Sequence, residues 1–370
     1  MHEKGEKIMK TSKTGCKTLF FLTLFVVLTF SEAIALTINS VSGTISNGSS
    51  ITISGSGFGT KTTPAPWVWD NFEDGTNANL VGTSPKGIWQ EYYSVGTTYP
   101  KYSTTAAYAG SLGAKKTTAQ AEEFVSYGAS GLNSDEMYYS IMFKWTEDVI
   151  NDSGAEPVMK LTRLNTQGDF YSPQPSIYTT LRTGTGNGWT YGDARNGTGD
   201  LYNEPFLLYV TLNTWHRIEV YWKLSTAGVA NGKVEFYIDN VEKEDGLWDN
   251  VITRATGYAN QKSDNFLLPM MQSLGSTNIY SFYADDVYVD RTRARVEVCN
   301  TATWSARTRC EIQIPSAWSD TAITFTGNQG TSSNFSNSYL YVIDKNGNVN
   351  SNGYRLCPSC PQPPANLTAQ

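Results

Sequence analysis

One segment of the chain carries most of the residue types that could bind or cleave a polar substrate. It comprises residues 214–239 and reads TWHRIEVYWKLSTAGVANGKVEFYID. Charged and aromatic residues occupy every second position of each half, so they would share one face of each strand. Cations on such a face can neutralise an acidic ligand, and aromatic rings can stack on flat groups such as sugar rings. The polar, aromatic-rich face consists of Trp215, Arg217, Glu219, Tyr221, Lys223 and Tyr237.

Other residues of the segment limit this chemistry. His216 is the one histidine that remains once the N-terminal segment is removed, and it falls beside Ile218 on the apolar face. We therefore expect a packed, structural histidine, and we exclude zinc held by paired histidines. Glu235 and Asp239 would lie about 13 Å apart in an extended strand, too far for the carboxylate pair of a retaining glycosidase. Because any half-exposed sheet presents polar residues, a purely structural face is the alternative.

The elements that must position these residues are strands. A turn-rich stretch joins the two alternating halves of residues 214–239, which predicts a long antiparallel hairpin. The same two-residue period predicts strands at residues 138–145, 157–164 and 176–182, whereas the rest of residues 168–199 indicates long loops. A composition with 32 Gly, 22 Tyr and 10 Trp but only 17% charged residues is typical of an all-β chain.

Length and charge narrow the classes of partner. A chain of 370 residues is long enough for two domains. Its formal net charge is −6, and the basic residues after the N-terminal segment are scattered along the sequence. Because no basic excess is present to displace phosphate counterions, we expect no nucleic-acid partner.

Residues 1–35 have the pattern of a secretory signal peptide. Several lysines precede an apolar run at residues 19–30, and Ala33-Ile34-Ala35 forms a small-residue cleavage site. The apolar run is too short for a membrane span. We predict cleavage after Ala35 and a protein that is secreted or held at the cell surface, with no membrane span after cleavage. An uncleaved anchor is the alternative.

Four cysteines remain after this cleavage, and export would expose them to oxidation. Four cysteines allow three pairings, of which we expect the local one, Cys299–Cys310 with Cys357–Cys360. A four-cysteine zinc site and a redox pair at Cys357-Pro-Ser-Cys360 are the alternatives.

Three stretches resemble the concanavalin A-like lectin and glucanase sandwiches, in particular their polysaccharide-lyase-like and laminin-G-like branches. NTWHRIEVYWKL…NGKVEFYIDN resembles the central hairpin, WDNFEDGT the opening strand and YSFYADDVYVD the closing strand. The resemblance implies a jelly-roll sandwich over residues 66–290. It also implies a structural calcium ion between the opening and closing strands, with no other cofactor required. The calcium ligands would be Asp70, Glu73, Asp74, Asp285 and Asp286.

The same resemblance bears on activity. Polysaccharide lyases of this fold neutralise a uronate carboxylate with Arg, Lys or Gln and use Tyr or His as the base. It therefore implies Arg217, Tyr221, Lys223 and Tyr237 as lyase candidates. The paired-carboxylate motif of the glucanases is absent, and the loop histidine of the lyases is not matched.

A second resemblance concerns both sides of this region. Residues 36–63 resemble the opening strands of an immunoglobulin-like IPT/TIG domain through ITISGSGFG. Residues 292–356 resemble its later strands through WSDTAIT and YLYVIDKNG. We infer that the jelly-roll sandwich is inserted into this smaller domain, which requires the two ends of the insert to lie close together. A short N-terminal arm with a separate C-terminal β-domain is the alternative. Residues 357–370 are proline-rich and predict a flexible tail.

These observations predict an exported, lectin-like protein that binds a polysaccharide or a cell-surface glycan. Trp189, Tyr191 and Arg195 would form a rim of loop residues beside the hairpin face. Other cell-surface proteins are further candidate partners. The alternatives are a polysaccharide lyase that acts on a uronate-containing glycan and a non-catalytic adhesion or structural module.

Overall fold

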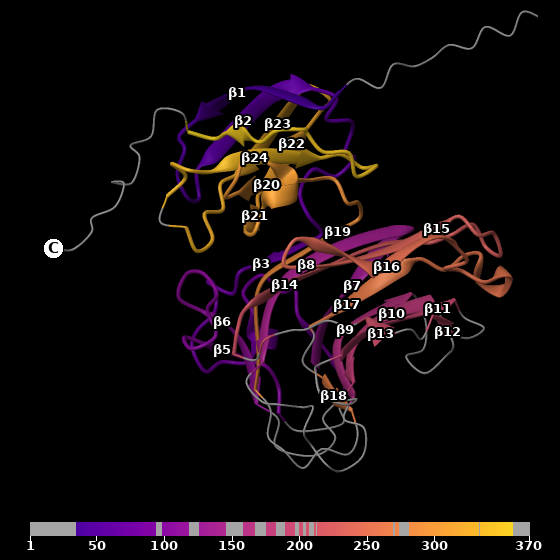
Figure 1. Cartoon of the computed structure of the whole chain (residues 1–370). Helices are drawn as coiled ribbons and strands as arrows, with labels where there is room; N and C mark the ends of the chain where they lie inside the picture. The colour runs from indigo at the N-terminus through magenta and orange to yellow at the C-terminus, as the bar shows by residue number, and fades with distance from the viewer. Residues whose placement is uncertain are drawn as a thin grey trace, which may run out of the picture. The chain divides into compact units, whose positions relative to one another are not determined.

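The structure of the chain is a computed structural model (Figure 1). It describes residues 35–93, 98–117, 126–145, 158–166, 175–182, 189–196, 200–202, 205–206, 211, 213–268, 271–273, 281–332 and 334–357. For residues 92–93, 145, 158–206, 242–246 and 271–273, only the backbone within these ranges is described. Residues 35–370 form one compact unit. The predicted signal peptide, apart from Ala35, and the proline-rich tail after Cys357 lie outside the described residues.

Within these residues the fold is all-β, as the sequence predicts. Antiparallel strands form four sheets, which make a large and a small sandwich. The helical elements are the short 3-10 turns Val81–Thr83, Thr256–Tyr258 and Trp304–Ala306. No helix of the described part is long and apolar enough to cross a membrane.

The large sandwich consists of an eight-stranded and a nine-stranded sheet. The eight-stranded sheet runs β16 (Val241–Val251), β15 (Gly232–Ile238), β14 (His216–Lys223), β8 (Glu136–Trp145), β19 (Ser281–Asp290), β6 (Gly113–Thr117) and β5 (Lys101–Ser103), with β3 (Val68–Asp70) beside β19. The nine-stranded sheet runs β12 (Asp200–Tyr202), β11 (Trp189–Asn196), β10 (Pro175–Arg182), β9 (Val158–Thr166), β17 (Ser263–Leu267), β7 (Ser126–Ser134) and β4 (Gln90–Tyr93). Two short strands, β13 (Pro205–Phe206) and β18 (Met271–Ser273), pair with β11 and β9.

The core of the large sandwich lies between its two sheets. Phe143, Val220 and Phe236 reach it from the eight-stranded sheet, and Leu132 and Phe266 reach it from the nine-stranded sheet. All five side chains are buried. Since successive residues of a strand point to opposite faces, their neighbours in the eight-stranded sheet lie on its second face, away from this core.

The small sandwich is built from both ends of the described chain. One sheet runs β1 (Thr37–Gly43), β2 (Ser50–Ser56), β23 (Ala322–Thr326) and β22 (Ile314–Trp318). The other runs β21 (Cys310–Ile312), β20 (Arg295–Cys299), β24 (Tyr339–Ile343) and β25 (Tyr354–Arg355). Because β2 pairs with β23, the chain leaves this sandwich after β2 and returns to it after β19. Whether the small sandwich belongs to the IPT/TIG family stays a prediction.

The central hairpin has the predicted form. Strands β14 and β15 pair with Ile218 opposite Ile238 and Tyr221 opposite Glu235. The strands predicted at residues 138–145, 157–164 and 176–182 correspond to β8, β9 and β10. The interpretation of residues 168–199 as loops is wrong for β11, which pairs with β10 along its whole length. Glycine and asparagine in this stretch hide the two-residue period that marks a strand.

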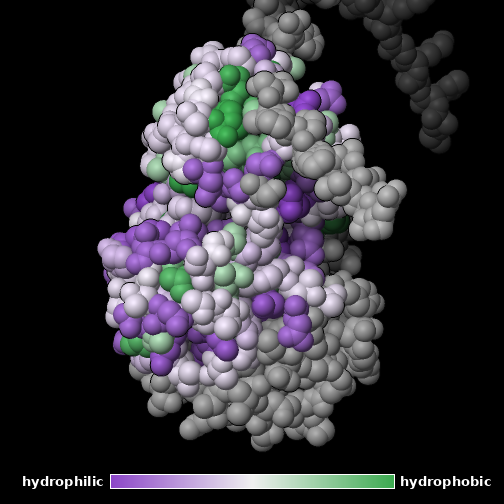
Figure 2. Space-filling model, turned by 90° about the vertical axis from the view of Figure 1, so that its left-hand side faces the viewer, coloured by the Kyte–Doolittle hydropathy of each residue, from purple (hydrophilic) through white to green (hydrophobic). Residues whose placement is uncertain are grey.

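The molecular face in Figure 2 is largely hydrophilic. Hydrophilic residues spread across the middle of this face, and hydrophobic residues form separate patches between them. Scattered apolar residues of this kind are ordinary on the surface of a soluble domain. The coloured residues of this face therefore offer no large apolar patch as a functional site.

Candidate functional site

The second face of the eight-stranded sheet carries the residues that the sequence singles out. Arg217, Glu219 and Tyr221 alternate on β14 with core residues such as Val220, so they lie on the face away from the core. The predicted division of the hairpin into an apolar and a polar face is therefore confirmed. Only the accessible parts of this polar face can bind a ligand.

The small sandwich covers part of this face. Arg217 donates hydrogen bonds to Glu219 at 3.1 Å, to Glu297 of β20 at 3.0 Å and to the Cys310 carbonyl of β21 at 3.2 Å. Arg217, Glu219 and Tyr221 are only 4%, 3% and 3% exposed. In this arrangement the three residues join the two sandwiches and do not present an open binding surface.

Two buried arginines share the carboxylate of Glu297. Arg295 donates to Glu297 at 2.6 Å and stacks over the Tyr138 ring at 4.3 Å. Burial alone would raise the pKa of Glu297, but Arg217 and Arg295 hold it below its ordinary range. A carboxylate that two buried cations keep ionised is a structural bridge, since the network is satisfied without any ligand.

His216 has the structural role that the sequence predicts. It is 6% exposed, and its Nδ1 lies 2.7 Å from Asp239 Oδ2. The other oxygen of Asp239 accepts the backbone N–H of Arg217 at 3.0 Å. Asp239 and Asn240 form the tight turn between β15 and β16, with φ angles of 51° and 66°. His216 thus ties the end of β14 to this turn.

A second part of the face carries a row of lysines and aromatic residues, of which Tyr283 is 9% exposed. Tyr283 of β19 lies opposite Lys144 of β8 on one side and Lys115 of β6 on the other, and Lys115 lies opposite Lys101 of β5. The Lys144 Nζ atom is 4.6 Å from the centre of the Tyr283 ring and 4.8 Å from that of Trp215. The Lys115 Nζ atom is 5.3 Å from the Tyr283 ring. We call Lys101, Lys115, Tyr283, Lys144 and Trp215 the lysine–aromatic row.

Among the described residues, this row has no carboxylate partner. Neither Lys115 nor Lys144 forms an ion pair with any described residue. Burial, and then repulsion from Lys115, lower the pKa of Lys144. Lys101 is exposed, and Lys115, Lys144 and Trp215 are partly exposed. An approaching anion would relieve the repulsion between the two ammonium groups, so the row is suited to an acidic ligand.

The row draws on strands that lie far apart in the sequence, and sequence reasoning missed most of it. The hairpin alternation includes Trp215, but nothing in the sequence indicates that β6, β19 and β8 are neighbours. The alternation of Tyr283 with the apolar Phe282 and Ala284 could have placed Tyr283 on the polar face, but Tyr288 shares that face only through the irregularity between Asp285 and Tyr288. Lys115 and Lys116 are adjacent, so the sequence alone could not indicate which lysine lies on that face.

Among the described residues, no three of the five predicted calcium ligands bring their carboxylate oxygens to one point. Asp70 accepts from Trp89 Nε1 at 2.6 Å, and Lys86 Nζ lies 3.2 Å from Asp70 and 2.9 Å from Asp74. Glu73 accepts two backbone N–H groups, and Asp285 accepts the backbone N–H of Tyr108 at 2.7 Å. In the described part, the one cluster with metal-ligand atom types is Glu297, Cys299 and Cys310. Its cysteines form a disulfide and offer no thiolate, and calcium binding stays an untested prediction.

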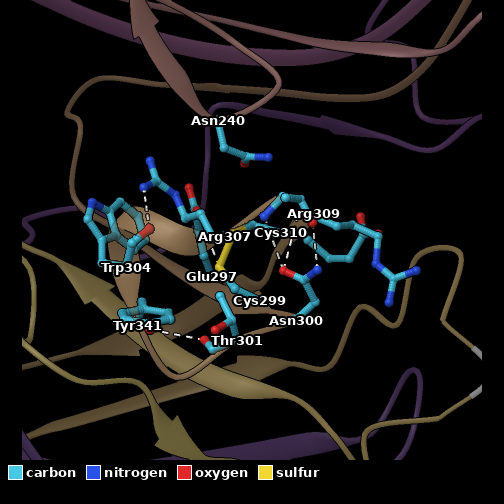
Figure 3. Close-up of a disulfide and its surroundings, with 12 residues drawn as sticks. Asn240, Glu297, Cys299, Asn300, Thr301, Trp304, Arg307, Arg309, Cys310 and Tyr341 are labelled. Atoms are coloured by element: carbon cyan, nitrogen blue, oxygen red, sulfur yellow. Dashed lines mark hydrogen bonds between the residues drawn. A yellow bond between two sulfur atoms is a disulfide. The ribbon is translucent and has the colours of Figure 1, made fainter.

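The cysteines follow the expected local pairing where they are described. Cys299 and Cys310 form a disulfide between β20 and β21 (Figure 3). This bond excludes the zinc site built from all four cysteines. Cys357 is also a disulfide cysteine, while Cys360 lies outside the described residues, so the Cys357–Cys360 pair stays a prediction.

The predicted rim residues Trp189, Tyr191 and Arg195 lie on β11, not on a loop. Only their backbone is described. The register pairs Tyr191 with Thr180 and Arg195 with Ser176 of β10. They therefore belong to the nine-stranded sheet, whereas Arg217 and Tyr221 belong to the eight-stranded sheet. The two groups of predicted binding residues do not share one sheet.

Comparisons with known proteins give weak likenesses. No family model matches the chain, and no curated protein matches it. An endo-β-1,4-glucuronan lyase from the fungus Trichoderma reesei has a TM-score of 0.44 at 11% identity, over 61% of this chain and 95% of that chain. A PL-14 alginate lyase from Aplysia kurodai has a TM-score of 0.43 at 11% identity, over 61% and 98%. The alginate lyase vAL-1 from Chlorella virus has a TM-score of 0.42 at 12% identity, over 61% and 99%. With TM-scores below 0.5, these likenesses do not indicate an activity. The strand pairing of the chain itself defines the fold.

Proposed function

We propose that this chain binds an acidic polysaccharide on the lysine–aromatic row. The observation that carries the proposal is the pair Lys115 and Lys144, which flank Tyr283 without a carboxylate partner in the described part of the chain. In a chain with a net charge of −6, such an uncompensated pair marks a place for a negative ligand. A uronate unit would place its carboxylate between the two ammonium groups.

The neighbouring aromatic residues would hold the sugar ring. Trp215 is partly exposed, and Tyr108 meets its ring edge-on at a centroid distance of 5.8 Å. This contact fixes the orientation of the indole before a ligand arrives, which lowers the entropic cost of binding. A charged group beside a preoriented ring suits an acidic carbohydrate better than a neutral one.

The proposed location is outside the cytoplasm. The Cys299–Cys310 disulfide supports export, because such bonds persist in oxidising compartments and are rare in reducing ones. Extracellular polysaccharides would then be within reach. The N-terminal segment that would direct export lies outside the described residues.

Affinity electrophoresis and calorimetry with polygalacturonate, alginate and a neutral β-glucan test the binding proposal. We expect the protein to bind the two polyuronates and not to bind the neutral glucan. The K115S/K144S variant should bind polyuronate about tenfold or more weakly, since it loses two charge-assisted contacts. R355Q, which removes a positive charge from β25 of the small sandwich, is a control and should bind normally. Equal affinity of the wild type and K115S/K144S would overturn the proposal.

Cleavage of the bound polysaccharide by β-elimination is the second candidate, and the position of Tyr283 favours it. In this reaction a base removes the proton from the carbon beside the uronate carboxylate, a carbon–carbon double bond forms, and the bond to the glycosidic oxygen breaks. The departing oxygen then takes up a proton. Lys115 and Lys144 would neutralise the carboxylate and so stabilise the negative charge that develops on it. The Tyr283 hydroxyl is the candidate group for proton transfer.

Absorbance of the unsaturated uronate product tests this second candidate. A lyase gives a rise in absorbance with time, and Y283F should abolish the rise while keeping the affinity, because it removes only the hydroxyl. A rise that survives in Y283F would remove Tyr283 from this role. Binding without any rise would leave a pure binding protein.

A further inference from the structure

A groove between the two sandwiches is a second feature with the chemistry of a ligand site. It consists of two adjoining hollows with volumes of about 810 and 690 Å³. Lys233, Arg293 and Asn346 line both hollows, so the hollows meet at these residues. Lys233 belongs to β15 of the large sandwich, and Asn346 belongs to the loop that follows β24 of the small one. We call the two hollows together the inter-sandwich groove.

Basic residues outnumber acidic residues along this groove. The basic ones are Lys61, Lys223, Lys233, Arg291, Arg293, Arg295, Arg307 and Lys345, and the acidic ones are Asp135, Glu136, Glu235 and Asp290. The chain as a whole is acidic, so this local excess does not follow from its composition. A concave, positively charged surface concentrates negative ligands and speeds their arrival.

The ion pairs within the groove do not neutralise all of its positive charge. Glu235 lies 2.8 Å from both Lys233 and Arg293, and Lys233 also lies 3.4 Å from the exposed carboxylate of Asp249. Asp290 is paired with Lys61 at 2.5 Å, and both side chains are buried. Lys223 and Lys345 are exposed and form no ion pair within the described part of the chain. These two lysines stand one on each sandwich and are free to bind an anion.

Two arginines of the groove have a hydrogen-bond donor without a partner, and each stacks over an aromatic ring. The Nε atoms of Arg293 and Arg307 are buried and have no hydrogen-bond partner. Arg293 stacks over the Tyr221 ring at 4.7 Å, and Arg307 stacks over Trp304 at 3.4 Å (Figure 3). A buried donor without a partner is costly, so a ligand oxygen or a water molecule that reaches it is favoured.

Aromatic surface completes the groove. Tyr221 lines the first hollow, and Tyr237 and Trp304 line the second. Tyr237 and Trp304 are partly exposed, and Leu247 beside them is 40% exposed. Cations alternating with aromatic rings along a groove fit a chain of acidic sugars, whose rings stack while their carboxylates or sulfates are neutralised. Lys223 and Tyr237, singled out from the sequence as candidates, thus line this groove with accessible side chains, whereas Tyr221 is buried beneath Arg293.

We propose that the inter-sandwich groove binds an acidic polysaccharide segment at a second site, distinct from the lysine–aromatic row, with both sandwiches supplying contacts. The large sandwich contributes Lys223, Lys233 and Tyr237, and the small sandwich contributes Trp304, Arg307 and Lys345. The small sandwich is then part of the recognition surface and not only a support. This site stands on its own residues, so it does not require the lysine–aromatic row to bind.

Lysine footprinting on the full mature chain tests the site directly. Acetylation of Lys223 and Lys345 is measured by mass spectrometry with and without oligogalacturonate of defined length. We expect both lysines to be protected by the oligosaccharide, while Lys86, which pairs with Asp70 and Asp74 and lines neither hollow, changes little. Unchanged acetylation of both Lys223 and Lys345 at saturating oligosaccharide would overturn the proposal.

Calorimetry separates this site from the one proposed above. The wild type should bind short oligogalacturonate at two sites per chain. K223S/K345S changes only exposed side chains, so it should fold normally, and should weaken one site about tenfold. K115S/K144S should weaken the other site and keep the groove. If K223S/K345S keeps the wild-type isotherm, the groove proposal fails while the proposed function stands. If K115S/K144S keeps the wild-type isotherm while K223S/K345S weakens one site, the proposed function fails and the groove proposal is supported.

Discussion

At the scale of single residues, the polar face of the hairpin has two different roles. Arg217 and Glu219 are buried in a network that bridges two sandwiches, while Lys144 lies further along the same face with no acidic partner in the described part of the chain. The residue types are alike, and what distinguishes them is whether the protein itself supplies the opposite charge. A cation that the protein pairs with its own carboxylate is structural, whereas a cation without an acidic partner is a candidate site for a ligand.

Replacing Arg217 tests the structural half of this argument. R217M leaves Glu219 and Glu297 buried without their shared cation, so we expect the free energy of unfolding to fall by about 3–5 kcal/mol. Urea denaturation followed by fluorescence measures the loss. R217M/E219Q removes one stranded carboxylate and keeps Glu297 paired with the buried Arg295, so it should recover part of the loss. A loss in R217M no larger than that of an exposed substitution would show that the network contributes little.

Glu311 gives the interface a pH dependence. It lies on β21, and its neighbours are Asp286, Arg217, Arg309 and the Tyr108 hydroxyl. Burial, and then the charge of Asp286, raise the pKa of Glu311 from an ordinary 4.5 to about 8. Burial also raises the pKa of Asp286, whose Oδ2 has no hydrogen-bond partner. These groups hold protons in the folded chain that the unfolded chain has already released.

The sign of the pH effect follows from this difference. Because the folded state binds more protons, the stability that it gains is full below pH 4.5 and is lost as pH rises towards about 8. We expect the melting temperature to fall between about pH 5 and about pH 8, and E311Q to flatten this fall. Thermal scans across that range measure it, with D320N, a change at an exposed carboxylate, as the control. A fall equally steep in E311Q would contradict the assignment to Glu311.

At the scale of elements, the sequence predicts strands well and their neighbours poorly. The alternation around Val220 is enough to define β14, since apolar residues recur at every second position. The same alternation cannot tell a polar face in water from a polar face against another domain, so the burial of Arg217 and Tyr221 was not predictable. The lysine–aromatic row is not predictable from the sequence for a related reason. Lys115, Tyr283 and Lys144 meet only through pairing between strands that are distant in the sequence.

The Cys299–Cys310 bridge links β20 and β21, the two strands from which Glu297 and the Cys310 carbonyl reach Arg217. Replacing both cysteines frees a loop whose ends are 11 residues apart, and we expect a loss of about 3 kcal/mol in the free energy of unfolding. Thermal unfolding of C299S/C310S measures this loss. Adding a reductant to the wild type should lower its melting temperature at least as far. A variant as stable as the wild type would mean that β20 and β21 hold their places without the bridge.

At the scale of the whole described unit, the two sandwiches share more than a linker. The chain crosses between them twice, before β3 and after β19, and Lys61 of the first crossing pairs with Asp290 at the end of β19. An apolar cluster of Tyr138, Tyr221, Tyr288 and Ile312 also spans both. Domains joined by a buried, well-satisfied contact unfold together, whereas domains joined by a thin contact do not.

This coupling predicts one cooperative transition for residues 35–370. Differential scanning calorimetry of the wild type should show a single peak whose calorimetric and van't Hoff enthalpies agree. I312S/I314S removes the buried and the partly buried apolar side chains that the small sandwich contributes to the shared cluster, and it should separate the peak into two. V41S, which disturbs only the core of the small sandwich, should lower the temperature without splitting the peak. Two peaks in the wild type would mean that the sandwiches fold independently. The inter-sandwich groove would then have no fixed width, and its affinity for an acidic segment would depend on the ligand to draw the two walls together.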